Sequence, residues 1–141
     1  MSDLDRALAE LPDPLRPQVR EWAEDYLQQP EPPLPAAVRQ SLPRVFASSE
    51  FVARCCLREP ALLPALEAQD LLTRPDRPGG ARERLEACLH SVADAEALSR
   101  ELRRFRRREM VRIAWRDLAG WAPLLETLAD LSALADACVD A

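Results

Sequence analysis

The sequence contains no lysine, a single histidine and only three glycines among its 141 residues. The missing lysine excludes Schiff-base chemistry and the phosphate-gripping lysine of P-loop proteins. There is no Cys-x-x-Cys spacing, and Cys88 and His90, two residues apart on a predicted helix, point in different directions. We therefore expect no metal site in this chain.

Long hydrophobic runs and targeting signals are also missing. The longest uncharged apolar stretch falls far short of the roughly 18 residues that a membrane helix needs. The acidic start Met-Ser-Asp-Leu-Asp does not resemble a signal peptide. We expect a soluble, cytoplasmic protein without membrane contact, in which Cys55, Cys56, Cys88 and Cys138 serve as small core residues.

What is abundant favours helix. Ala, Leu, Glu and Arg dominate, β-branched residues are scarce, and 48% of the residues are hydrophobic. A chain of this length supports one core and is too short for two domains. We predict an all-α fold, an irregular helical bundle of about six or seven helices, in a single domain covering residues 1–141.

Caps, prolines and apolar spacing divide the chain. The predicted helical segments are about 2–11, 14–29, 36–47, 49–59, 61–66, 81–90, 94–118 and 123–141. Pro43 is expected to bend or break its helix. The proline-rich stretch 30–35 predicts a stiff linker, and the prolines and glycines of 73–80 predict a mobile loop.

The last predicted helix carries an apolar repeat. Its members, spaced at three or four residues, are Leu124, Leu128, Leu131, Ala135 and Cys138. The stripe reaches the chain end without a stop signal, which suggests a piece of a larger protein.

Eight arginines lie between Arg100 and Arg116, whereas the chain as a whole carries a net charge of −5. On a helical wheel Leu98, Leu102 and Phe105 share one face. Further along, that line continues with Glu109, Arg112 and Arg116, while the apolar residues move to the opposite side. We expect the buried side of this helix to switch near 106–110, as in a strut between two layers.

Three interpretations of these arginines remain open. They can form a solvated face paired with acidic segments of the same chain. They can bind phosphate or nucleic acid, which the overall acidity makes the weakest of the three. They can also dock against another domain or an acidic partner, because guanidinium groups pair with carboxylates through two hydrogen bonds. The candidate contact residues are Arg103, Arg104, Arg107, Arg108, Arg112 and Arg116.

Three stretches of the sequence carry a family resemblance. They are Val-Phe-Ala-Ser-Ser-Glu-Phe-Val at 45–52 followed by Pro60, Leu-Ser-Arg-Glu-Leu-Arg-Arg-Phe-Arg-Arg-Arg-Glu-Met-Val-Arg-Ile-Ala-Trp-Arg-Asp-Leu at 98–118, and Thr-Leu-Ala-Asp-Leu-Ser-Ala-Leu-Ala at 127–135. In this order they resemble the amino-terminal helical region of bacterial bifunctional glutamine synthetase adenylyltransferase/adenylyl-removing enzymes. Residues 1–40 add no support to the resemblance.

The resemblance implies a parent enzyme with two nucleotidyltransferase modules of the DNA polymerase β type. One module removes AMP from glutamine synthetase, the other attaches it from ATP, and PII signalling proteins and glutamine set the balance between them. Asp-x-Asp carboxylates on a strand hold the metal ions, Mg²⁺ in the full-length family. Ser2-Asp3-Leu4-Asp5 spells a similar motif, but it precedes a helical pattern and fits a helix cap better.

No catalytic residue or cofactor is therefore assigned to this chain by the resemblance. It implies a non-catalytic helical scaffold that precedes the deadenylylating module and contacts the catalytic module missing from this chain. The alternatives are a free-standing helical interaction module and, less favoured, an arginine-helix nucleic-acid binder.

Overall fold

The computed structural model describes residues 2–28 and 34–140. Within these ranges the chain is all-α, as predicted, and no strand occurs. The elements are α1 (Asp3–Ala9), the 3-10 turn η1 (Asp13–Leu15), α2 (Arg16–Leu27), α3 (Ala36–Ser48), α4 (Glu50–Arg58), α5 (Leu62–Ala68), α6 (Gly80–Leu89), α7 (Ala95–Leu118) and α8 (Leu124–Asp140). These described residues hold eight α-helices, one for each of the eight predicted segments, so the estimate of about six or seven helices was slightly low.

Side-chain caps fix several helix starts where the sequence predicted them. Asp94 accepts a hydrogen bond from the backbone N–H of Ala97 at 2.8 Å, and Ser49 accepts one from Val52 at 3.2 Å. Ser2 and Asp5 form a reciprocal capping box. The Ser-Asp-x-Asp stretch is therefore a helix cap.

The end of α7 is equally well defined by its backbone. Gly120 has a φ of +80°, which an L side chain rarely adopts. The N–H groups of Gly120 and Trp121 donate to the carbonyls of Asp117 and Arg116. This Schellman arrangement stops the longest helix of the chain.

Pro43 does not break its helix, because α3 continues through it to Ser48. Most of the predicted linker 30–35 lies outside the described residues. The predicted loop 73–80 is indeed non-helical up to Gly79.

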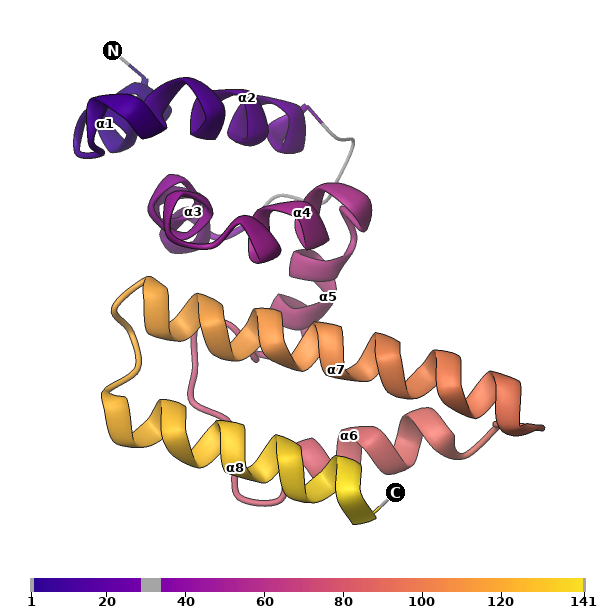
Figure 1. Cartoon of the computed structure of the whole chain (residues 1–141). Coiled ribbons are helices and arrows are strands. Elements are labelled where there is room, and N and C mark those ends of the chain that lie inside the picture. Colours follow the sequence, from indigo (N-terminus) through magenta and orange to yellow (C-terminus); the bar gives the residue numbers. More distant parts are fainter. Residues whose placement is uncertain (1, 29–33, 141) are drawn as a thin grey trace.

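Helix α7 separates two layers (Figure 1). Helices α1 to α5 stack on one side of it, and α6 and α8 lie on the other side. The larger hydrophobic cluster draws on α1 to α5 and receives Val111 and Trp115 from α7. The smaller cluster consists of Leu85, Phe105, Ile113, Leu134 and Ala137. The predicted strut between two layers is confirmed.

Trp115 anchors α7 in the larger cluster. Its side chain is fully buried, its indole N–H donates to the hydroxyl of Ser41 at 3.0 Å, and its ring meets Phe46 edge to face. Tyr26 also packs edge to face with Phe46. This aromatic row ties α2, α3 and the carboxyl-terminal half of α7 together.

Candidate interaction site

The six arginines predicted as contact residues divide into two groups along α7. Arg112 and Arg116 are buried, with 1% and 3% of their surface exposed. Arg103 and Arg104 are exposed, while Arg107 and Arg108 are half-buried. The first pair lies where α7 passes between the layers, and the other four lie toward its amino-terminal end.

The buried arginines are paired within the chain. Arg116 donates to both carboxylate oxygens of Glu126, at 2.9 and 3.3 Å, and to the carbonyl of Leu72 at 2.9 Å. Arg112 donates to Glu109 at 3.2 Å and to Asp130 at 3.5 Å. We therefore no longer include Arg112 and Arg116 among the residues offered to a partner.

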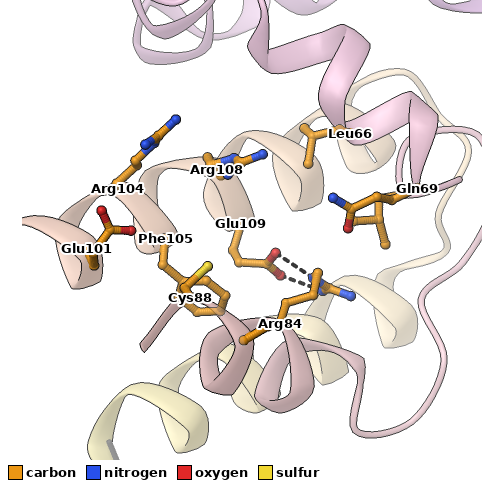
Figure 2. A pocket seen from close by; sticks show the side chains of 11 residues that line it. Leu66, Gln69, Arg84, Cys88, Glu101, Arg104, Phe105, Arg108 and Glu109 are labelled. Atoms are coloured by element: carbon orange, nitrogen blue, oxygen red, sulfur yellow. Dashed lines mark hydrogen bonds and ion pairs between the residues drawn. The ribbon is translucent and has the colours of Figure 1, made fainter. Parts of the chain in front are cut away.

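A third arginine that the sequence analysis did not single out completes this ionic cluster. Figure 2 shows Arg84 of α6 directed at Glu109 of α7. Its guanidinium group donates to both oxygens of Glu109, at 2.8 and 2.9 Å, and to both oxygens of Asp76, at 2.8 and 3.0 Å. Such two-fold pairing fixes geometry as well as charge, so it locks α6 onto α7.

Burial and charge act in opposite directions on the acids of this cluster. Burial alone would raise the pKa of Asp76, but hydrogen bonds from Arg84 and the charges of Arg84 and Arg112 lower it below its ordinary value. For Asp130, burial prevails over the attraction of Arg112, and its pKa is raised. Asp130 is therefore the less well compensated of the two carboxylates.

The same ion pairs determine how α8 docks. Glu126 and Asp130 lie four residues apart and face Arg116 and Arg112, which are also four apart. The face of α8 that carries these acids also carries Leu134 and Ala137, which are buried. As a result, most of the predicted apolar stripe stays outside the core: Leu124, Leu128 and Leu131 remain exposed, and Cys138 is the member that packs against the smaller cluster.

The predicted mobile loop is tied to the cluster through Asp76. A Cβ atom at Gly80 would lie 2.3 Å from the Oδ1 atom of Asp76, so only glycine leaves room for this carboxylate. Mobility of residues 73–80 stays a prediction, but one residue of the segment is anchored to α6 and α7.

Three of the four remaining candidate arginines line an open groove between the end of α4 and the first half of α7. This groove has a volume of about 440 Å³. Arg103, Arg104 and Arg107 line one wall. The other residues that line it are Cys55, Arg58, Glu59, Arg100 and Glu101. We call these eight residues the arginine groove.

Few of these guanidinium groups have a protein partner. Arg104 pairs with Glu59 at 3.4 Å. In the described part of the chain, the side chains of Arg58, Arg100, Arg103 and Arg107 make no hydrogen bond or ion pair. At the base of the groove, burial raises the pKa of the Cys55 thiol, while the positive charges of Arg107 and Arg58 act against that effect. The arginine groove is a concentration of uncompensated positive charge.

Arg108 lies outside this groove. It lines a neighbouring cavity of about 160 Å³ together with Arg104, Phe105 and Glu109 (Figure 2). The floor of that cavity is the ionic cluster, whose carboxylates are already paired. The structure therefore brings three of the six predicted arginines together in one groove. The prediction did not include Arg58 and Arg100, which also line this groove.

Two further features concern metal binding and membrane helices in residues 2–28 and 34–140. No group of three or more His, Cys, Asp or Glu is placed to hold a metal ion there. None of the helices in that part of the chain is long and apolar enough to cross a membrane. Cys55 and Cys56 are buried as expected, whereas Cys88 and Cys138 are only half-buried.

Comparisons with known proteins give a consistent result. The family model of glutamate-ammonia ligase adenylyltransferase matches residues 39–141. A bifunctional glutamine synthetase adenylyltransferase/adenylyl-removing enzyme of Pseudomonas aeruginosa is 50% identical over 97 residues, or 69% of this chain and 10% of the relative. The protein of the same name from Thioalkalivibrio sulfidiphilus is 48% identical over 101 residues, or 72% of this chain and 10% of the relative.

The chain thus spans about a tenth of the length of these relatives. No solved structure matches it.

Proposed function

The chain belongs to the glutamate-ammonia ligase adenylyltransferase family, and on this premise we propose that it serves as a helical scaffold of such an enzyme. In this role it precedes and positions the nucleotidyltransferase module that removes AMP from glutamine synthetase. The chain itself carries out no chemistry. Mg²⁺ and ATP are used by other parts of the enzyme, which acts in the cytoplasm and responds to PII signalling proteins.

One observation carries this proposal. The matched segment, residues 39–141, contains the buried ionic cluster, the ring contact of Phe46 with Trp115, the whole smaller hydrophobic cluster and most of the larger one. These features fix the relative positions of helices and leave the arginine groove and the leucine stripe of α8 on the surface. A rigid body with two unused surfaces suits a positioning role better than a catalytic one.

A segment exchange tests the scaffold role. The 97-residue segment of the Pseudomonas aeruginosa relative that matches this chain is replaced by the corresponding residues of this chain. Both removal and attachment of AMP on glutamine synthetase are then measured. The proposal expects the exchanged enzyme to keep both activities, because the helical body is preserved. A folded exchange protein without adenylyl removal would contradict it, as would adenylyl removal by the 141-residue chain alone.

A free-standing interaction module is the competing interpretation. It expects the segment to be dispensable, so that an enzyme lacking it removes AMP at the normal rate. The scaffold proposal expects that deletion to abolish removal.

A further inference from the structure

The arginines of the groove repeat along one face of α7. Counted from Arg100, the next arginines lie three, four and seven residues along the helix, at Arg103, Arg104 and Arg107. Seven residues span about 10 Å, or two helical turns. Arg58, the last residue of α4, supplies positive charge from the opposite wall. The positive charge therefore forms a row and not a point.

The groove is basic within an acidic chain. Its lining contains five arginines and two glutamates, while the whole chain carries a charge of −5. Only Arg104 is paired with one of the glutamates, Glu59. Complementary charge is the simplest way to compensate the remaining guanidinium groups.

The lining argues against a phosphate as the ligand. Two carboxylates, Glu59 and Glu101, stand in the groove and would repel a dianion. Helix α4 ends at the groove, and the negative end of its dipole does not attract an anion. No helix start or glycine turn contributes to the lining. No aromatic residue lines the groove either, so nucleotide bases have nothing to stack on.

We propose that the arginine groove binds an acidic helical segment of a partner protein surface, with Glu or Asp at three-, four- and seven-residue spacing. Carboxylates repeated along a partner helix would meet the guanidinium groups at Arg100, Arg103 and Arg107 one by one. Glu59 and Glu101 then face polar or basic positions between the acids. This inference rests on the proposed function for its setting, since it gives the scaffold a contact chemistry.

The binding test uses the folded 141-residue chain and a fluorescent helical peptide of about 15 residues with Glu at the matching spacing. The control peptide has Gln in place of each of these Glu residues. We expect the Glu peptide to bind about tenfold more tightly than the Gln peptide at low salt, with the difference shrinking as salt rises. Equal binding of the two peptides would overturn the proposal.

Variants of the chain localise the binding. Arg103→Gln with Arg107→Gln is expected to weaken binding of the Glu peptide by about tenfold, the effect of two partly exposed ion pairs. Arg106→Gln is the matched control, because Arg106 is exposed on the same helix but does not line the groove. Since Arg103 and Arg107 have no partner among the described residues, these variants should fold normally. Equal losses in both variants would refute the assignment to the groove.

Competition separates the ligand classes. Inorganic phosphate and a short DNA duplex are added to the complex with the Glu peptide. The reference competitor is unlabelled Gln peptide at the same ionic strength. If phosphate or the DNA duplex displaces the Glu peptide at a lower concentration than this reference does, the groove binds phosphate groups and the proposal is wrong. If the chain binds the Glu peptide but the exchanged enzyme is inactive, the scaffold role alone is wrong. If the exchanged enzyme is active but the chain does not bind the Glu peptide, only this inference is wrong.

Discussion

Replacing Arg112 with methionine tests whether the buried ionic cluster holds α6, α7 and α8 together. Arg112 is 1% exposed and lies within ion-pair distance of Glu109 at 3.2 Å, Asp130 at 3.5 Å and Asp76 at 3.8 Å. Methionine keeps much of the side-chain length and removes the charge. Arg84 would then be the remaining ion-pair partner of Asp76 and Glu109, while Asp130 would lose the arginine with which it pairs.

The expected cost follows from the charge that loses its partner. Removing one member of a buried ion pair typically costs about 3–5 kcal/mol. The lower end applies here, because Asp130 keeps some solvent contact, with 15% of its side chain exposed, and Arg84 continues to neutralise Glu109 and Asp76. We expect the free energy of unfolding to fall by about 3 kcal/mol near pH 7, a large share of a typical total.

The loss should depend on pH. Without Arg112 the pKa of Asp130, already raised by burial, rises further in the folded state. The folded protein then binds more protons than the unfolded chain between the ordinary pKa of Asp and this raised value. Stability of the variant therefore falls as pH rises through that window. The difference in free energy of unfolding between the variant and the parent chain should therefore be smaller near pH 4, where an ordinary Asp titrates, than near pH 7.

Urea unfolding followed by circular dichroism at both pH values measures the effect. Arg106→Met is the control on the same helix, expected to change stability by less than about 0.5 kcal/mol. Adding Asp130→Asn to the Arg112 variant should recover part of the loss, because one unpaired carboxylate is removed. A loss below about 1 kcal/mol for Arg112→Met near pH 7 would show that the cluster does not hold the layers together.

Two further predictions concern Gly80 and Cys56. Gly80→Ala should lower the free energy of unfolding, measured in urea, by about 1–3 kcal/mol, because its Cβ would displace the Asp76 carboxylate from Arg84. Gly79→Ala has nothing near its Cβ but a φ of +78°, so it should cost only about 1 kcal/mol of backbone strain. A larger loss for Gly79→Ala than for Gly80→Ala would contradict this prediction. Burial raises the pKa of the Cys56 thiol, so a thiol reagent near pH 8 should modify Cys56 only after unfolding. Mass spectrometry of peptides measures the labelling, and rapid labelling of Cys56 in the folded chain would show that the thiol is accessible.

Helix positions were largely predictable because their signals are local. The hydroxyl of Ser49, the carboxylate of Asp94 and the positive φ at Gly120 act within a few residues of the helix end that they determine. Pro43 was the exception, since tertiary packing keeps α3 helical around it: Leu42, Pro43 and Val45 are all buried.

The fate of the arginines was not predictable from one helix. A helical wheel places Arg112 and Arg116 in line with Phe105, but it does not show what lies opposite. The acids that face them, Glu126 and Asp130, belong to α8, and their matching four-residue spacing was the available signal. Arg58 comes from a helix whose end meets α7 only in three dimensions, so the groove could not be seen in the sequence.

Because α7 supplies side chains to both hydrophobic clusters, neither cluster can be completed without it. Phe105 and Ile113 close the smaller one, while Val111 and Trp115 close the larger one. Melting of this one helix therefore opens both layers at once. The calorimetric and van't Hoff enthalpies of thermal denaturation should agree, as they do for a single cooperative unit.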